Sequence, residues 1–441
     1  MKSSLTPPAS AEPRDQGWRA EWYDRESTPG GGEVARERLF HVVLSLPMSH
    51  SLAYGLIELP WWGYVSVTFL TIQVLFLAIT LYLHRDQAHG GLILHPILRH
   101  VFRFCLWFGS GAVTKEWVAV HRRHHAYADL PGDPHSPVIF GLKRVVWEGY
   151  ELYVAAARDP AILEHYGRGT PDDWLERHLY TRYSSLGVVL FGVTMLLLFG
   201  VPAIAMVAIH LVSQPFFAGG VVNGLGHAIG YRSYEMPSTA TNLLPWGLLL
   251  GGEELHNNHH AFPRSARFAV QRWELDIGWV FICAFRALGL ARVRWVAPRV
   301  RMDEKRRTEL DADTVQALFT NRMHVLRDYA RRVVLPVCKD LARGEPRGSV
   351  PRSTAKLLIR HPALLADEAR RVLGDLQARY EVLRRVVEFR DGLQQMWNGA
   401  AGSQSVAQLR EWCARAEASG IRALKEFAAA LPRYSRGTRA A

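Results

Sequence analysis

Residues 184–231 read SSLGVVLFGVTMLLLFGVPAIAMVAIHLVSQPFFAGGVVNGLGHAIGY, which is 48 residues without one charged side chain. A helix that crosses a membrane needs about 20 apolar residues at a rise of about 1.5 Å per residue. The run is therefore long enough for two spans. Gly200 and Pro202 near its middle predict a turn, so we expect a hairpin of two transmembrane helices.

Two other apolar runs come before this hairpin. Residues 59–83 are 25 uncharged residues, enough for one span. Residues 39–57 are also uncharged but contain His41, Pro47 and His50, which makes them a borderline fourth span. Buried core helices usually give apolar runs of about 10–14 residues, shorter than the strong runs here. We therefore expect an all-α integral membrane protein with about four transmembrane helices.

The remaining sequence divides the chain into three parts. Residues 1–38 are rich in Pro, Gly, Glu and Arg and predict a disordered lead without a secretory signal. Residues 39–300 form the predicted membrane domain. Residues 301–441 predict a basic helical region with a linker at 341–351. From residue 291 onward there are 30 Lys and Arg against 17 Asp and Glu. These cations alternate with acids along helices, which favours anionic lipid or a redox partner over nucleic acid.

The cysteines exclude two classes of protein. The four cysteines lie far apart and form no CxxC pair, which argues against a disulfide framework and against a fused rubredoxin or thiolate-bound iron–sulfur module. We expect a reducing environment that faces the cytoplasm.

Histidine is the residue type that carries chemistry in this chain. It occurs 19 times and gathers in LHRDQAH, HRRHH and HNNHH, with one more at the end of NGLGH. In HxxHH the residues at i, i+3 and i+4 share one helix face. His84 and His89 are five residues apart, about 140° off a common face in a regular helix. We expect the helix to end or distort there.

Eight or nine neutral imidazoles exceed the four ligands of one zinc ion, so we expect two metals. Soluble di-iron proteins bind their metals with glutamates and a pair of ExxH motifs. This chain has one ExxH, at Glu253 and His256, and no second, so we do not expect the carboxylate class of di-iron protein. An all-nitrogen shell leaves iron with open positions for dioxygen, and C–H oxidation needs such chemistry.

Four segments carry a resemblance to a known family. They are YLHRDQAH…LHP, KEWVAVHRRHH…DPHSP, NGLGHAIGYR and PWGLLLGGEELHNNHHAFP. With them the chain resembles the membrane-bound acyl desaturases, of the stearoyl-CoA and bacterial delta-9 acyl-lipid types, over residues 59–300. The resemblance implies four transmembrane helices under a cytosolic helical cap. TPDDWLERHLYTRY at 170–183 resembles the bacterial branch.

The resemblance also implies the site residues and the cofactor, two iron ions. Asn223 would reach a metal through water, and Trp117 would line the bend of the acyl tunnel. No catalytic residue is implied beyond the metal centre. The implied ligands are His84, His89, His121, His124, His125, His227, His256, His259 and His260.

Other polar residues near the boxes have less specific interpretations. We expect Glu253 and Glu254 to orient imidazoles, with a solvated helix cap as the alternative. We expect His95, His100 and His135 to be structural rather than ligands. The other residues near the boxes are arginines. They could bind the headgroup of the substrate, or they could reflect the general enrichment of basic residues on the cytoplasmic side of membrane helices. These arginines are Arg85, Arg122, Arg123 and Arg232.

The implied reaction is oxygen-dependent insertion of a cis double bond, expected at delta-9, into a saturated acyl chain of acyl-CoA or membrane lipid. The chain contains neither an HPGG haem motif nor a flavin fingerprint. Electrons would come from a separate carrier with its reductase: ferredoxin, rubredoxin, flavodoxin or a cytochrome b5-like protein. We expect the bacterial cell membrane, with the site facing the cytoplasm. Two alternatives stay open, a histidine-box hydroxylase or alkane monooxygenase and a membrane metal transporter or sensor.

Overall fold

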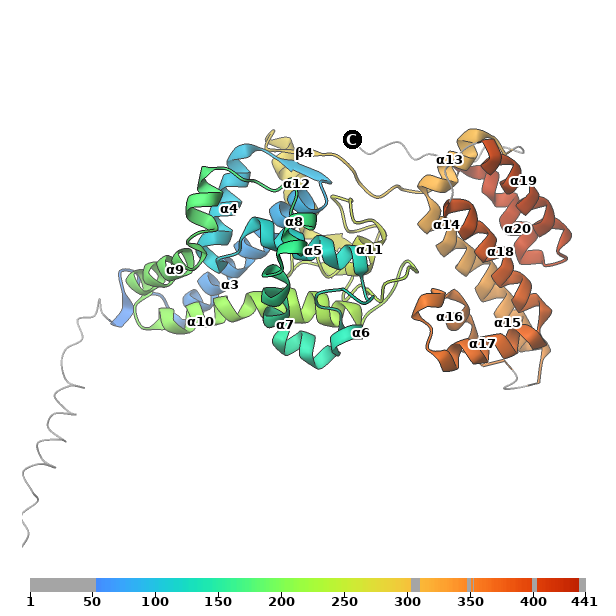
Figure 1. Cartoon of the computed structure of the whole chain (residues 1–441), viewed down its shortest axis with the longest axis horizontal. Coiled ribbons are helices and arrows are strands. Elements are labelled where there is room, and N and C mark those ends of the chain that lie inside the picture. The colour runs from blue at the N-terminus through green and yellow to red at the C-terminus, as the bar shows by residue number, and fades with distance from the viewer. Residues whose placement is uncertain (1–52, 303–309, 347–349, 352, 399–402, 436–441) are drawn as a thin grey trace, which may run out of the picture. The chain divides into compact units, whose positions relative to one another are not determined.

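The computed structural model describes residues 53–441, apart from 303–309, 347–349, 352, 399–402 and 436–441 (Figure 1). The expected lead at 1–38 and nearly all of the expected span at 39–57 lie outside the described residues. The described chain is mostly helical, with six short strands in three two-stranded sheets. The predicted all-α class is therefore correct.

Two helices are long and apolar enough to cross a membrane, within the part of the chain that the structure describes. The first is Trp61–Ala88, made of α3 (Trp61–Ala78) and the π-helix η1 (Ile79–Ala88). The second is Pro202–His227, in which α10 (Pro202–Gln214) continues through η3 (Pro215–Gly224) and η4 (Leu225–His227). Two shorter apolar helices are α9 (Ser184–Phe199) and α12 (Ile277–Ala287).

The predicted turn is present and joins two apolar helices. Among the described residues only the second of them, as part of Pro202–His227, is long enough to cross a membrane, so the expected hairpin of two spans and the total of four are not confirmed. Gly200 has φ +61°, a left-handed value that glycine adopts without strain, and it turns the chain from α9 into α10. α10 then packs against α9 and α3 (Figure 1). On α9, a Cβ at Gly187 would lie 2.2 Å from the carbonyl oxygen of Trp107, so only glycine lets α9 approach α4 (Pro96–Ser110) this closely.

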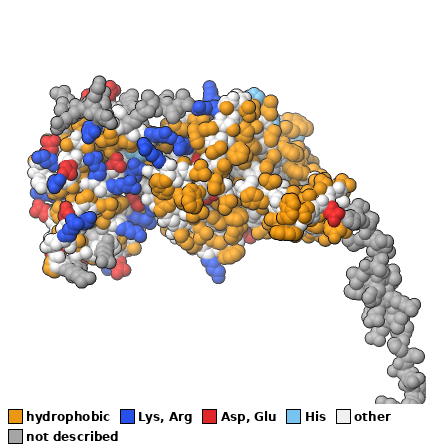
Figure 2. All heavy atoms as spheres, turned by 180° about the vertical axis from the view of Figure 1, so that it is seen from behind, with side chains coloured by type: hydrophobic (Ala, Val, Ile, Leu, Met, Phe, Trp, Pro, Cys, Tyr) orange, Lys and Arg blue, Asp and Glu red, His pale blue; other side chains and the backbone are white. Residues whose placement is uncertain are grey.

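The apolar helices present their side chains outward. In the most apolar 18-residue stretch of each long helix, only 33% of the first and 28% of the second are buried. Exposed side chains include Phe69 and Leu70 on α3 and Leu197 on α9. Figure 2 shows the broad hydrophobic surface that results. Exposed apolar area costs about 25 cal/mol per Å² in water, and a buried core helix would not leave it open. Such a surface is expected of helices that lie in a membrane.

A buried histidine links three of these helices. His210 of α10 lies between the hydroxyl of Thr71 on α3, at 3.1 Å, and the carbonyl oxygen of Gly109 on α4, at 3.0 Å. The last carbonyls of a helix lack an intrahelical donor. The imidazole N–H satisfies this one, and the ring joins the helices where water is excluded.

The elements between and after the long helices are shorter, and two of them carry six of the nine implied histidine ligands. They follow the order α5 (Thr114–Tyr127), α6 (Pro137–Phe140), α7 (Leu142–Ala157), α8 (Pro160–Tyr166), η2 (Glu176–Tyr180) and α11 (His256–Ala261). Strand β1 (Leu92–Leu94) pairs antiparallel with β4 (Ala291–Val293), and β2 (Trp246–Gly247) pairs parallel with β3 (Leu275–Asp276). Arg103 on α4 is buried against Asp173 and Glu176, which fixes the segment around η2.

The C-terminal region has a hydrophobic core of its own. Its helices are α13 (Ala312–Thr320), α14 (Arg322–Tyr329), η5 (Ala330–Val334), α15 (Leu335–Gly344), α16 (Thr354–Ile359), η6 (Pro362–Leu364), α17 (Asp367–Arg379), α18 (Glu381–Asn398), α19 (Ser403–Ala418), α20 (Arg422–Ala430) and η7 (Leu431–Arg433). Strand β5 (Arg301–Met302) pairs with β6 (Tyr434–Ser435). All buried members of this core fall between Leu310 and Tyr434.

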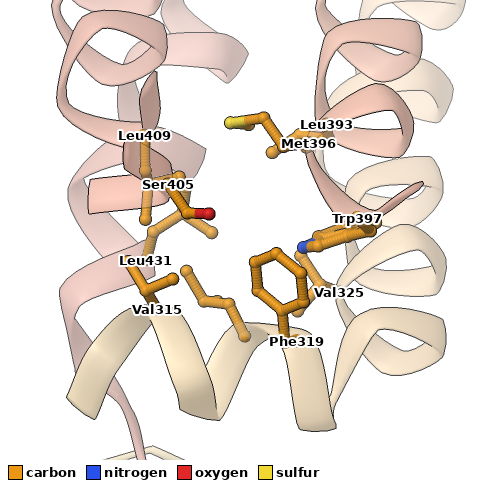
Figure 3. A pocket seen from close by; sticks show the side chains of 10 residues that line it. Val315, Phe319, Val325, Leu393, Met396, Trp397, Ser405, Leu409 and Leu431 are labelled. Carbon is orange, nitrogen blue, oxygen red and sulfur yellow. The ribbon is translucent and has the colours of Figure 1, made fainter. Parts of the chain in front are cut away.

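Figure 3 shows a small gap in this core, lined by Val315 and Phe319 of α13, Trp397 of α18 and Leu409 of α19. Its volume is about 10 Å³, no more than one water molecule needs. The core is closely packed. The linker predicted at 341–351 begins later than expected, because α15 continues to Gly344.

Candidate metal centre

A π-helix brings the first two histidines together. The backbone N–H of His89 donates to the carbonyl oxygen of His84, five residues earlier, at 3.1 Å. This i+5 pattern defines a π-helix, and it widens the turn that would otherwise separate the two side chains. Their ring centroids lie 5.0 Å apart. The predicted distortion of the helix at this point is confirmed.

The two HxxHH segments are helical, as their spacing predicts. HRRHH ends α5, and HNNHH begins the short helix α11. His227 lies on η4, at the end of the second long helix. Trp117, one turn before His121 on α5, stacks on the His121 ring at 4.9 Å with an interplanar angle of 14°.

The nine histidines form two groups, and in each group one ligand atom of every member lies within 4.8 Å of those of the others. Residues of the same box are divided between the groups. Site A consists of His84, His89, His121, His125 and His259. Site B consists of His124, His227, His256 and His260.

The geometry of both sites suits metal ions. Neighbouring Nε2 atoms approach to between 2.8 and 3.0 Å in site A and between 3.0 and 3.3 Å in site B. Nitrogens bound at about 2.0–2.1 Å to one ion lie about 3 Å from each other. Burial, and then the neighbouring imidazoles, lower the pKa of His125, His256 and His259 well below its usual range. The rings are neutral at pH 7, which is the form that binds a metal.

A carboxylate of a different segment fixes one ring of site A. His84 Nδ1 lies 2.7 Å from Glu253 Oε1, which also accepts from the hydroxyl of Thr80 at 2.7 Å. This contact confirms the orienting role predicted for Glu253. Burial raises the pKa of Glu253 to about 8, although Arg85 and Thr80 oppose the shift.

Two aspartates do the same in site B. His124 Nδ1 lies 2.9 Å from Asp133 Oδ2, and His227 Nδ1 lies 3.0 Å from Asp129 Oδ2. Burial by itself would raise the pKa of Asp129, but the hydrogen bond and charge of His227 lower it well below its usual range. A donating Nδ1–H leaves the Nε2 lone pair free to point at the metal position. Neither aspartate was predicted from the sequence, although Asp133 belongs to the DPH segment next to the second box.

Comparison with known proteins agrees with this site. A family model described as fatty acid desaturase matches residues 59–280, half of the chain. The chain belongs to the fatty acid desaturase family. It is an oxidoreductase of the desaturase type, and it is similar to several curated desaturases.

One such relative of the desaturase is "Delta-9 acyl-lipid desaturase 2" of Arabidopsis thaliana, 29% identical over 310 residues, which are 68% of this chain and 95% of the relative. Another is "sn-1 stearoyl-lipid 9-desaturase" of Synechocystis sp., 31% identical over 55% of this chain and 76% of the relative. "Icosanoyl-CoA 5-desaturase" of Limnanthes douglasii is 30% identical over 49% and 60%.

A second family model, described as a transposase, matches residues 314–441 of the desaturase. That range begins after the last histidine of the two sites. It lies in the C-terminal helical region with its separate hydrophobic core. The likeness therefore concerns this region and leaves the interpretation of the histidine sites unchanged.

The structure corrects the role expected for Glu254 of the desaturase. Its Oε1 accepts from the backbone N–H groups of Leu249 and Leu250, at 2.8 and 2.9 Å, rather than from an imidazole. Glu254 thus holds the loop before α11. Glu253 and Glu254 are neighbours in sequence, and only the fold distinguishes them.

The other predicted residues occupy distinct places. Asn223 is half-buried on η3, one turn before His227. His95 caps α4 and is exposed, as is His100. His135 is buried, with its ring centroid 4.6 Å from that of His124. It adjoins site B outside the four-histidine group, and together with His124 and Asp133 it forms a further group whose ligand atoms lie within 4.8 Å of one another.

The arginines near the boxes are engaged within the protein. Arg85 is fully buried and pairs with Asp276 at 3.0 Å. Arg122 donates to the backbone carbonyls of Gln87, Ala88, Tyr166 and Arg168. Arg123 donates to Gly132, and Arg232 to Glu235 and nearby carbonyls. These contacts give all four a structural role, and the headgroup interpretation stays a prediction.

Proposed function

We propose that this desaturase inserts a cis double bond, at delta-9, into a saturated fatty acyl chain, with two iron ions held by the nine histidines. The observation that carries the proposal is the division of the histidines into two groups whose Nε2 atoms converge. When bound, the iron pair would supply the oxygen-dependent oxidation of unactivated C–H bonds.

The protein's own part in the reaction is to hold the metal ligands and the acyl chain in position. Glu253, Asp129 and Asp133 accept from Nδ1 and keep each ring turned so that Nε2 faces the metal position. Asn223 would act on one metal through water. Trp117 stacks on His121, and it would line the bend of the acyl tunnel. The position of the double bond would follow from where the chain is held, because no carbon of a saturated chain is activated.

The relatives support the substrate class that we propose. Two of them are named for action on acyl lipids and one for action on an acyl-CoA. We propose an acyl-CoA or phospholipid substrate, dioxygen, and electrons from a separate carrier of the ferredoxin, rubredoxin, flavodoxin or cytochrome b5 type with its reductase. We also propose four spans in a bacterial cell membrane, with the metal centre facing the cytoplasm. The basic C-terminal region would contact anionic lipid or the redox partner.

Fatty acid analysis tests the function. Cells that lack delta-9 desaturation receive the wild-type gene or the His125→Ala variant, and their lipids are examined by mass spectrometry after derivatisation of double bonds. The expected result is a delta-9 alkene with the wild type alone. A hydroxylated chain would establish a hydroxylase instead, and identical profiles from the two genes would overturn the proposal.

A further inference from the structure

One short loop supplies both carboxylates of site B. The loop between α5 and α6 places Asp133 against His124 and Asp129 against His227. The side chains in these two contacts are at most 1% exposed. The backbone N–H of Asp129 also donates to Asp133 Oδ2 at 2.8 Å, so the two acceptors are tied to each other.

Asp129 has a backbone conformation that side chains seldom adopt. Its φ is +65°, and it is the one residue other than glycine with positive φ among the residues that the structure describes. This left-handed region favours glycine and admits Asp and Asn at a cost. Because glycine would fit the backbone without strain, an aspartate here calls for a reason in its side chain.

The carboxylate of Asp129 collects donors from three segments. Oδ2 accepts from the backbone N–H of Thr239 at 2.6 Å and from the hydroxyl of Ser238 at 3.1 Å. Oδ1 accepts from the hydroxyl of Ser136 at 2.6 Å. With His227, every partner is a donor, so an amide nitrogen in this position would face other donors. Asp129 thereby ties the α5–α6 loop, η4 and residues 238–239 together around one imidazole.

His227 depends on this support more than the other histidines do. The remaining eight lie two or three to a segment, at the end of η1, on α5 or on α11, where the helix fixes their spacing. His227 stands alone on η4, at the end of a long helix. In site A the described hydrogen bonds give an equivalent carboxylate only to His84. The two sites are therefore supported by different carboxylates on different segments.

We propose that Asp129 is a positioning residue that secures the metal of site B selectively, by holding His227. The proposal rests on the proposed function in that it takes both sites to bind iron. Loss of a partner that orients a metal ligand typically weakens metal binding about 10–100-fold. Without the Asp129 carboxylate, site B is expected to lose its metal while site A keeps its own.

The test measures iron per folded chain in full-length detergent-purified protein. The variants are Asp129→Asn, which keeps the shape, and Asp129→Gly, which relieves the backbone and removes the carboxylate. Asp173→Asn is the matched control, because Asp173 pairs with Arg103 and contacts no histidine of either site. We expect close to two irons in the wild type and the control, and close to one in both Asp129 variants. Mössbauer spectra of the variants should lose one of two iron signals.

Titration of iron-free protein with Co²⁺ gives a second readout. Both Asp129 variants should show one unchanged affinity and one weakened 10–100-fold. Asp129→Gly also removes the hydrogen bonds to Ser136, Ser238 and Thr239, so the unfolding temperature of the iron-free variant should fall. A positioning role weakens site B alone, whereas a purely structural role would weaken both affinities. Wild-type metal content in both variants, or equal loss from both sites, would overturn the inference. A wild type without two irons would overturn the proposed function itself.

Discussion

The region with the histidines buries imidazoles and carboxylates beside several apolar clusters, whereas the C-terminal region buries one apolar cluster. In the first, the interior holds imidazoles and carboxylates, and apolar side chains cover much of the outside. In the second, a single apolar cluster fills the interior and arginines with acids line the outside. Figure 2 displays both surfaces. We therefore expect lipid and metal to stabilise the first region, while burial of apolar area in water stabilises the second.

The largest effect is expected from removal of one ligand. His125→Ala takes a nitrogen from site A, and we expect desaturation to fall below detection together with iron content. His100→Ala, an exposed histidine on α4, is the control and should keep both. His135→Ala should keep its iron too, since His135 lies outside both groups. If it loses iron as completely as His125→Ala, site B has to be redrawn to include it.

Metal removal should affect the two regions differently. Chelation leaves nine neutral imidazoles facing one another, so α5 and α11 lose the interactions that hold them in place. We expect amide hydrogen exchange to speed up by at least about tenfold around residues 121–125 and 256–260, a change in opening free energy of about 1.4 kcal/mol. Exchange within α13–α20 should not change. Equal acceleration in both regions would contradict the expectation that metal stabilises only the region with the histidines.

A cavity in the C-terminal core should destabilise that region and leave the metal centre unchanged. Phe427 is 1% exposed and packs edge-to-face on Tyr329 at 5.1 Å. Phe427→Ala should lower the free energy of unfolding of this region by about 3–5 kcal/mol, measured by denaturant titration. Iron per chain should remain that of the wild type. A loss of iron in this variant would show that the metal centre depends on the C-terminal core.

The smallest effect is expected from a charge on the outside of that region. Arg384 and Glu388 form an i, i+4 pair on α18 at 3.8 Å, and both side chains are 56% exposed. Such pairs contribute about 0.3–0.5 kcal/mol. Glu388→Gln should therefore change unfolding by no more than this and leave iron content unaltered. A larger loss would mean that surface ion pairs, as well as the core, stabilise the region.

The sequence by itself determined what depends on local spacing. Uncharged runs gave the apolar helices and the turn at Gly200, and HxxHH put three imidazoles on one helix face in both boxes. The five-residue spacing of His84 and His89 required a distortion, and the helix is indeed of the π type there. The number of histidines indicated two metals, and the motifs in combination indicated the family.

Only the tertiary structure decided how the histidines are divided between the two sites. The second box sends His124 to site B and its neighbour His125 to site A. Spacing along one helix cannot predict this, because it depends on which other segment each ring faces. The carboxylates that orient the rings are equally non-local: Asp129 is 98 residues from His227, and Glu253 is 169 from His84. A buried imidazole needs an acceptor for its second nitrogen, but the segment that supplies it is fixed only when the chain has folded.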